Sequence, residues 1–260
     1  MTEVTIHSTA VVDPSAELGL DVTIGPYAVV EADTRIGDGC RLDAHSVVRQ
    51  YTTLGRECHL HPMAVIGDLA QDLSFKGAKS YVEIGDKCVF REGTTVHRGT
   101  KADTVTKLGN HVYMMVQSHV GHNCTVHDHV ILVNGAALGG YVEVQKGAFL
   151  SGFVGIHQFC RVGSLCLIAA NTKIDRDLPP FTLVDGFPRA IKRINRIGMQ
   201  RAGIDDESIA LVEQSYLQIA KSSDPLEAGK SLGDSEHAIL RQIGEFYRTS
   251  DRGVMRRFAL

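Results

Sequence analysis

Large apolar residues recur at every sixth position through most of the chain as far as Ile174. The row runs from Ile6 to Ile66, from Ile84 to Val96 and from Leu108 to Ile174, and a small or β-branched residue stands four positions after most of its members. Neither the 3.6-residue period of an α-helix nor the two-residue period of a strand explains a spacing of six. Hexapeptide repeats specify a parallel β-helix, in which each hexad is one short strand plus a corner and three hexads make one coil.

The repeat therefore predicts a mainly β fold, and this form of the hexad resembles the left-handed kind of parallel β-helix. We expect the β-helix to occupy residues 1–180. Two segments, at about 67–83 and 97–107, keep no hexad motif and are expected to leave the prism as loops. Loops on a rigid scaffold often carry function.

The pattern changes after Pro180, and residues 181–260 are expected to form a C-terminal α-helical domain. Helices are predicted over 196–203, 206–221 and about 234–249, with Asp205 or Asp206 capping the second. Between Arg189 and Arg201 the chain carries five basic residues and no acidic one. This segment is either a solvated helix face or a surface for phosphate or an acidic partner.

Composition narrows the class of protein. The 260 residues are 43% hydrophobic with a net charge of -3, so no overall positive field attracts nucleic acid. No segment has the roughly 18 apolar residues of a membrane span, and the start of the chain does not resemble a signal peptide. The six cysteines occupy the small inward position of the hexad and are expected to be reduced core residues. We expect a cytoplasmic protein.

The stretch QSHVGHNC at 117–124 holds two histidines that could carry chemistry. Residues 18 apart share a column in stacked coils, so His122 shares a column with Gly140 and lies on the column next to that of His157. The two histidines are expected about two coils, or roughly 10 Å, apart, which is too far for a shared metal ion within one chain. An imidazole beside glycines suits proton transfer near neutral pH. An exposed corner histidine is the alternative.

Six short motifs are spread over the chain. They are QDL at 71–73, VHRGT at 96–100, SHVGHNC at 118–124, HQFC at 157–160, DLPP at 177–180 and N-x5-R-x-G at 195–203. On these motifs the chain resembles the UDP-N-acetylglucosamine 3-O-acyltransferase family of lipid A biosynthesis, which belongs to the wider lipopolysaccharide pathway. The resemblance implies a homotrimer that transfers a 3-hydroxyacyl chain from acyl carrier protein to the sugar 3-hydroxyl. It implies active sites between subunits, no metal and no soluble cofactor.

The resemblance also implies roles for single residues. By position, His122 is the general base, Asn123 orients it and the Gly140 N–H is an oxyanion donor. Ala170 falls at the wall position that limits acyl length, which implies a medium-to-long chain. The remaining positions implied to bind substrate are Gln71, Asp72, His119, Tyr141, His157 and Gln158, with Asn195 and Arg201 facing the nucleotide. The basic segment 189–201 falls where the acidic carrier protein would dock.

Several positions depart from the family pattern. Asn123 stands where the family often has Asp, and Ser74 stands where it has Lys, with Lys76 two residues further on. Tyr141 and Pro188 replace histidines, and Ala202 replaces an arginine. Relatives with less charge near QDL use a 3-amino sugar nucleotide and form an amide, so this acceptor is an open alternative.

Other functions remain possible on the same prism. A zinc-dependent hydratase would bring three histidines together across a subunit interface, and the chain has 12 histidines. The related N-acyltransferase of the pathway carries an extra N-terminal domain, whereas the hexads here begin by Ile6. A coenzyme A acetyltransferase would lack the HRGT and HQFC motifs, and a non-catalytic scaffold would tolerate loss of His122.

Overall fold

The computed structural model describes residues 3–186 and 189–259 and contains three long sheets of short strands. Sheet A consists, in spatial order, of β1 (Thr5–Ile6), β4 (Thr23–Ile24), β7 (Arg41–Leu42), β10 (His59–Leu60), β13 (Val89–Phe90), β16 (Tyr113–Met114), β19 (Ile131–Leu132), β22 (Phe149–Leu150), β25 (Leu167–Ile168), β27 (Thr182–Asp185) and β28 (Ala190–Ile194). Sheet B consists of β2 (Val11–Val12), β5 (Val29–Val30), β8 (Val47–Val48), β11 (Val65–Asp68), β14 (Thr95–His97), β17 (His119–Val120), β20 (Ala137–Leu138), β23 (Gly155–Ile156) and β26 (Lys173–Ile174). Sheet C consists of β24 (Arg161–Val162), β21 (Glu143–Val144), β18 (Thr125–Val126), β15 (Val105–Leu108), β12 (Tyr81–Ile84), β9 (Thr52–Leu54), β6 (Arg35–Ile36) and β3 (Glu17–Leu18).

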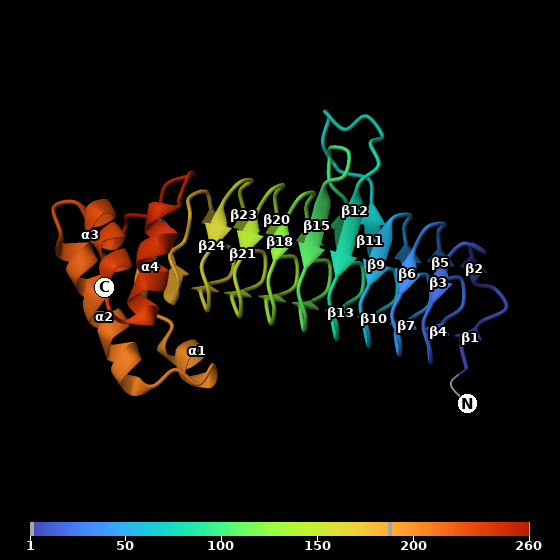
Figure 1. Cartoon of the computed structure of the whole chain (residues 1–260), viewed down its shortest axis with the longest axis horizontal. Coiled ribbons are helices and arrows are strands. Elements are labelled where there is room, and N and C mark those ends of the chain that lie inside the picture. The colour runs from blue at the N-terminus through green and yellow to red at the C-terminus, as the bar shows by residue number, and fades with distance from the viewer. Residues whose placement is uncertain (1–2, 187–188, 260) are drawn as a thin grey trace.

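Consecutive strands of the chain fall in different sheets, and every third strand returns to the same sheet, so three strands complete one coil. In sheet A, for example, Thr5 pairs with Thr23 and Thr23 pairs with Arg41, both in parallel. Figure 1 shows these coils stacked in a row that leads from the N-terminus to the C-terminal helices. The parallel β-helix predicted from the hexads is confirmed.

The backbone conformation of the corners repeats with the same six-residue period as the sequence. Positive φ recurs at every sixth residue, as at Asp21, Tyr27 and Asp33, and most of these residues are not glycine. The left-handed region is unfavourable for residues with a Cβ, so each corner needs support from its neighbours. That support comes from bonds between coils, such as the one donated by the His45 N–H to the Pro26 carbonyl at 3.1 Å.

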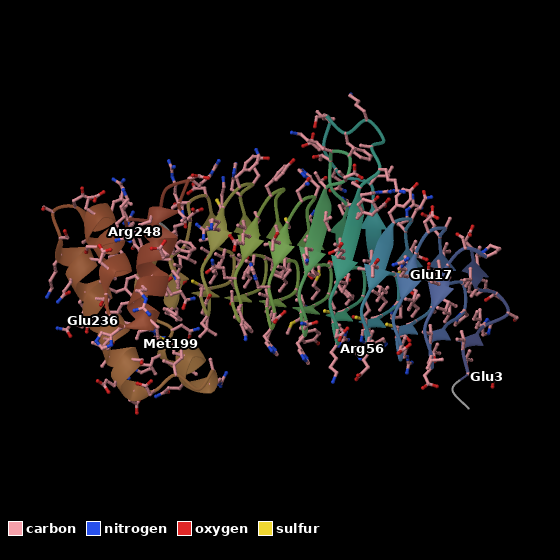
Figure 2. The ribbon with its side chains drawn as sticks, viewed as in Figure 1. Glu3, Glu17, Arg56, Met199, Glu236 and Arg248 are labelled. Atoms are coloured by element: carbon pink, nitrogen blue, oxygen red, sulfur yellow. The ribbon has the colours of Figure 1, made fainter. Side chains whose placement is uncertain are left out.

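The inward positions of the hexad form one continuous core along the prism. Leu42, Leu60 and Leu132 are fully buried, and so are their counterparts in most other coils. All six cysteines are free and buried among them, which confirms their expected place in the core. Polar side chains lie outside, as Figure 2 shows for the labelled Glu17 and Arg56.

Two loops leave the prism on the same side (Figure 1). The first loop comprises residues 69–80, between β11 and β12. It lengthens the coil that carries it, because Arg41 pairs with His59 on the next coil, whereas the partner of His59 on the following coil is Val89. The second loop, residues 98–104, is shorter than the expected segment 97–107 because β14 and β15 extend into it. The loops are joined by the Ser80 hydroxyl, which donates to the Gly99 carbonyl at 2.6 Å.

Sheet A continues beyond Pro180 into a hairpin that the sequence did not predict. The strand β27 pairs in parallel with β25 and antiparallel with β28. The first part of the basic segment 189–201 is therefore strand β28, and the expectation of a helix face there is wrong. Ala190 and Ile191 are buried on this strand, while Lys192 and Arg193 are exposed. Burial does not alternate here because the pairing with β27 shifts register at this point, with Val184 opposite Ile191 and Leu183 opposite Arg193.

The C-terminal region consists of α1 (Arg196–Arg201), α2 (Asp206–Lys221), α3 (Pro225–Ser231), the 3-10 helix η1 (Leu232–Asp234) and α4 (Ala238–Arg248). Asp205 caps α2 by accepting from the Ser208 N–H at 2.7 Å. The predicted apolar face of α2 is buried and comprises Ile209, Val212, Tyr216 and Ile219. Helix α3 was not predicted, although Asp224 and Pro225 are a cap and a first-turn proline.

The helices pack on the last coils of the prism. The Tyr216 hydroxyl donates to the Pro180 carbonyl at 2.7 Å, and both groups are buried. Arg161 of β24 donates to the Thr249 carbonyl at 3.1 Å. Met199, labelled in Figure 2, is the buried residue of α1. These contacts hold the helical region against the prism end within one chain.

Candidate active site

His122 lies at the corner between sheets B and C, beside the two loops. Its Nδ1 lies 3.0 Å from Oδ1 of Asn123, and its Nε2 lies 3.5 Å from Oδ2 of Asp72. The edge of its ring meets Tyr141 with 5.4 Å between ring centroids. Only 7% of the residue is exposed. The alternative of an exposed corner histidine is therefore wrong, because the imidazole is enclosed on three sides.

The backbone of Thr100 decides which end of the Asn123 amide faces His122. The Thr100 N–H can only donate, so the Asn123 atom 3.0 Å away must be the amide oxygen. The same oxygen accepts from the Thr100 hydroxyl at 3.2 Å. Because that oxygen also faces Nδ1 of His122, a neutral imidazole carries its proton on Nδ1 and keeps its lone pair on Nε2. The nitrogen near Asp72 is thus the one able to accept a proton.

Tyr141 closes the side of this network. Its hydroxyl lies 3.1 Å from the Thr100 hydroxyl, and its ring stacks on Phe159 at 4.9 Å between centroids. Asn123 and Tyr141 both adopt positive φ, at 60° each, because both stand at prism corners. The network Asn123–Thr100–Tyr141 therefore connects two coils and the second loop, and it fixes the orientation of the His122 ring.

Gly140 lies directly next to His122 on the following coil. A Cβ at this position would stand 2.2 Å from Cε1 and 2.4 Å from Nε2 of His122. No positive φ is involved, so the requirement for glycine here is one of space. Among the described residues no acceptor is recorded for the Gly140 N–H, although Gly140 is buried. A buried N–H without a partner is available to a ligand oxygen.

The first loop brings Asp72 to His122. Hydrogen bonds from Ser74 lower the pKa of the Asp72 carboxyl, and the nearby His122 lowers it further. The carboxylate is therefore charged at neutral pH. Gln71 is exposed on the same loop, and Lys76 turns away to the Leu73 carbonyl at 3.3 Å.

His119 forms a second histidine site on the adjoining face. Its Nδ1 lies 2.8 Å from the Thr95 hydroxyl, and its ring packs edge-on against His97 at 4.9 Å between centroids. Burial lowers the pKa of His119 to about 4, with smaller contributions from His97 and His122. Burial also lowers the pKa of His97. Both rings are consequently neutral at pH 7. His119 is hydrogen-bonded to Thr95, whereas Nδ1 of His97 is buried without a partner among the described residues.

His157 and Gln158 lie on the coil after Gly140 and make no recorded contact with His122. Arg252, near the C-terminus, donates to Nδ1 of His157 at 2.9 Å. The same Nδ1 lies 3.2 Å from the Gln158 carbonyl, so it faces one donor and one acceptor. Gln158 is exposed.

Asn195 and Arg201 lie away from this corner, in a cavity of about 1150 Å³ between sheet A and the helical region. Phe181, Leu183 and Arg193 also line it, and His122 does not. The Asn195 amide is the N-cap of α1: it accepts from the Gly198 N–H at 3.1 Å and donates to the Leu165 carbonyl at 2.8 Å. Pro188 lies outside the described residues.

Comparison with known proteins decides the family. A family model described as "Udp N-acetylglucosamine O-acyltransferase; Domain 2" matches residues 177–255. The chain is also 46% identical to the acyl-[acyl-carrier-protein]–UDP-N-acetylglucosamine O-acyltransferase of Alkalilimnicola ehrlichii, over 96% of this chain and 99% of that relative. The chain belongs to the acyl-[acyl-carrier-protein]–UDP-N-acetylglucosamine O-acyltransferase family. The family resemblance found in the sequence motifs is thereby confirmed.

Solved structures of this O-acyltransferase family share the whole fold. LpxA from Bacteroides fragilis, a UDP-N-acetylglucosamine acyltransferase, superposes with a TM-score of 0.93 at 32% identity, over 97% of this chain and 100% of that one. LpxA from Acinetobacter baumannii gives 0.92 at 34% identity, over 96% and 99%. The likeness thus includes both the prism and the helices. In the part of the chain that the structure describes, no helix is long and apolar enough to cross a membrane.

The two other features expected from the O-acyltransferase family lie at the C-terminal end of the prism. Ala170 lies between β25 and β26 and lines no cavity recorded within this chain. In the basic segment 189–201, Arg189 pairs with Asp175 and Arg196 pairs with Glu213. No carboxylate partner is recorded among the described residues for Lys192, Arg193 or Arg201. Three of the five cations are thus free to meet an acidic surface.

Three residues of the site were not assigned roles from the sequence. Thr100 and His97 belong to the motif VHRGT, which carried the family resemblance but gave no reason to place either beside His122. Arg252 lies far along the chain from His157 and belongs to no motif. A hydroxyl or guanidinium whose partner is distant in sequence leaves no periodic signal, so these contacts emerge only from the fold.

Proposed function

We propose that this protein transfers a 3-hydroxyacyl chain from acyl carrier protein to the 3-hydroxyl of UDP-N-acetylglucosamine, the first step of lipid A biosynthesis. The observation that carries the proposal is that a nitrogen able to accept a proton lies beside an N–H that has no hydrogen-bond partner. Nε2 of His122 holds a lone pair beside Gly140, whose buried N–H has no recorded acceptor in residues 3–186 and 189–259. Acyl transfer needs a base for the hydroxyl and a donor for the oxyanion, close together.

The chemistry follows from these two groups. The sugar hydroxyl gives its proton to Nε2 of His122 as its oxygen attacks the thioester carbonyl. The carbonyl oxygen becomes an oxyanion that accepts from the Gly140 N–H. The tetrahedral intermediate then collapses to the ester, and the departing thiolate takes the proton back from the imidazolium. Asp72 stabilises the positive charge that develops on His122, because its carboxylate lies 3.5 Å from Nε2. No metal, soluble cofactor or covalent enzyme intermediate takes part.

Substrate binding in this proposal depends on a homotrimer. The cavity that holds Asn195 and Arg201 does not include His122 of the same chain, and in this proposal a neighbouring subunit brings the two parts together. Asn195 and Arg201 would then face the nucleotide, with Arg201 as the planar phosphate donor. His119, Tyr141, His157, Gln158 and Gln71 complete the sugar and acyl contacts.

In this proposal the carrier protein docks on the basic segment 189–201 through its free cations Lys192 and Arg193. Acyl carrier proteins are acidic, and unpaired cations on one strand suit such a partner. Ala170 forms the end wall of the acyl pocket together with a neighbouring subunit. Ala170→Met should shift the preferred donor to a shorter acyl chain; an unchanged preference across a series of donors would reject that assignment.

A 3-amino sugar nucleotide is the second candidate acceptor. Asn123 is neutral, whereas a charged residue at this position would strengthen the base. Ser74 occupies the position of the family lysine, and its backbone N–H donates to Asp72. An amine is a better nucleophile than a hydroxyl and needs less help from a base. The test is transfer from one 3-hydroxyacyl carrier protein to the 3-hydroxy and 3-amino sugars side by side. We expect the hydroxyl sugar to be preferred at least tenfold, and preference for the amine would replace the ester by an amide.

A further inference from the structure

Three metal-binding side chains meet at a different corner of the prism from His122. Asp43 and His61 lie at the corner between sheets A and B, His59 lies on β10, and the ligand atoms of all three fall within 4.8 Å of one another. Asp43 and His61 directly follow the paired ends of β7 and β10 and so share a column on neighbouring coils. His59 stands two residues before His61, and the two imidazoles stack with 4.0 Å between centroids.

The distances in this group suit a small metal ion. Oδ2 of Asp43 lies 2.8 Å from Nε2 of His59 and 3.9 Å from Nδ1 of His61. Ligand bonds of about 2.0–2.2 Å place neighbouring ligand atoms of a zinc ion roughly 3–3.5 Å apart. The two distances bracket this range, so small shifts of the side chains would complete the coordination. The side chains are only 19–30% exposed, which limits the motion that binding must restrain.

Only one pair in this group is joined by a hydrogen bond, between Nε2 of His59 and Oδ2 of Asp43 at 2.8 Å. Within the part of the chain that the structure describes, the His61 ring makes no hydrogen bond; its nearest partners are Asp43 at 3.9 Å and Glu92 at 3.8 Å. Arg41 donates to Oδ1 of Asp43 at 2.7 Å, which orients the carboxylate and leaves Oδ2 to face the histidines. Orientation of a ligand by a second hydrogen bond is a regular feature of metal sites.

The charges around the group set limits on its affinity. Arg41 pairs with Asp43, and Arg91 pairs with Glu92. Their two positive charges offset the negative charges of these two carboxylates. Arg91 holds both carboxylate oxygens of Glu92 at 3.0 Å, so Glu92 is not counted as a ligand. Three protein ligands and an open fourth position are then available. Two imidazoles and one carboxylate select zinc and its neighbours over magnesium or calcium, which prefer sites made of oxygen alone.

We propose that Asp43, His59 and His61 bind one divalent transition-metal ion of the zinc class per chain. The ion links two neighbouring coils just before the first loop leaves the prism. It takes no part in acyl transfer, and the proposal does not depend on the function of the His122 corner. Its expected consequence is a more stable prism, because a ligand that binds only the folded state raises the melting temperature.

The test is a titration of the chelator-treated full-length protein with Zn²⁺ and, separately, with Co²⁺. We expect one ion per chain with a Kd in the micromolar range or below, a visible Co²⁺ spectrum of a site with nitrogen ligands, and a Tm that rises by several degrees with Zn²⁺. Asp43→Asn and His61→Ala should each weaken binding at least tenfold. Without metal, both variants should still unfold in one cooperative transition and give the circular dichroism spectrum of the wild type, which shows that they fold.

The chain offers a matched control. His111 and His129 stack in the same way, with 4.7 Å between centroids, but belong to no three-ligand group among the residues described. His111→Ala should bind Zn²⁺ like the wild type, and so should His122→Ala. The proposal is overturned if the wild type binds neither ion even well above micromolar concentrations, or if Asp43→Asn and His61→Ala bind as the wild type does. Adventitious binding to exposed histidines would show the second pattern.

Discussion

Gly140→Ala should disable the enzyme by moving a single ring. The added Cβ would stand 2.2 Å from Cε1 of His122, whereas ordinary contact begins near 3.4 Å. The ring must move by the difference between these two distances, and that movement breaks the 3.0 Å contact between Nδ1 and Asn123. A displacement of about 1 Å at a reacting group can cost about a hundredfold in rate, or about 2.7 kcal/mol in the activation barrier.

The Gly140→Ala variant should keep its fold and its oxyanion donor. All three atoms that the new methyl group would approach most closely belong to the His122 ring, and alanine retains the backbone N–H. We expect kcat to fall about a hundredfold and the unfolding transition to shift little. Gly155→Ala, whose methyl would meet no atom within 4 Å, is the control for loss of a glycine from a coil.

A double variant tests the reasoning directly. Because the predicted clash involves only the His122 ring, Gly140→Ala should cost nothing further in a His122→Ala background. Acyl transfer would be measured with a 3-hydroxyacyl carrier protein as donor for all four combinations. A Gly140→Ala single variant with wild-type kcat, or a double variant much slower than His122→Ala, would refute the account of this corner.

Three further predictions concern the supports of the site. Thr100→Val removes the hydroxyl that bonds to both Asn123 and Tyr141. It should lower kcat about five- to tenfold with KM little changed, because the loss of these two hydrogen bonds raises the barrier by about 1 kcal/mol or slightly more; an unchanged kcat would remove Thr100 from the network. The pKa of His119 is lowered to about 4, so the unfolded chain binds the extra proton between pH 6.5 and 4. The shift leaves stability unchanged above pH 6.5, where the ring is neutral in both states, and lowers it by up to about 3 kcal/mol as the pH falls to 4. Urea unfolding should therefore show a smaller loss between pH 7 and 4.5 for His119→Gln than for the wild type, and equal losses would contradict this. Tyr216→Phe leaves the buried Pro180 carbonyl without its donor and should cost about 1–2 kcal/mol in urea unfolding, with kcat unaffected.

The prism could be predicted because the sequence pattern that produces it is periodic. Every coil repeats one inward apolar position and one corner, so residues as far apart as Leu18 and Leu150 report the same geometry. The hairpin of β27 and β28 has no such repeat. The second strand of this hairpin includes Lys192 and Arg193, and their charges suggested a helix face until the pairing with β27 was seen.

The site was predictable only in part, for a related reason. The column rule placed His122 beside Gly140 correctly, since the ladder carries one coil over the next. Residues of the two loops do not follow the 18-residue spacing of the coils, so the approach of Asp72 and Thr100 to His122 could not be predicted from the sequence. The same holds for Arg252 at His157, which depends on how the C-terminal segment returns to the prism.

The most direct test of the central claim is acyl transfer from a 3-hydroxyacyl carrier protein to UDP-N-acetylglucosamine, with the wild type compared with His122→Ala under single-turnover conditions. We predict transfer by the wild type and a rate at least about a hundredfold lower in the variant, since a general base contributes about 10² to 10⁴ in rate. The variant should still melt as the wild type does. Transfer that persists at a wild-type rate in His122→Ala would contradict the assignment of the base.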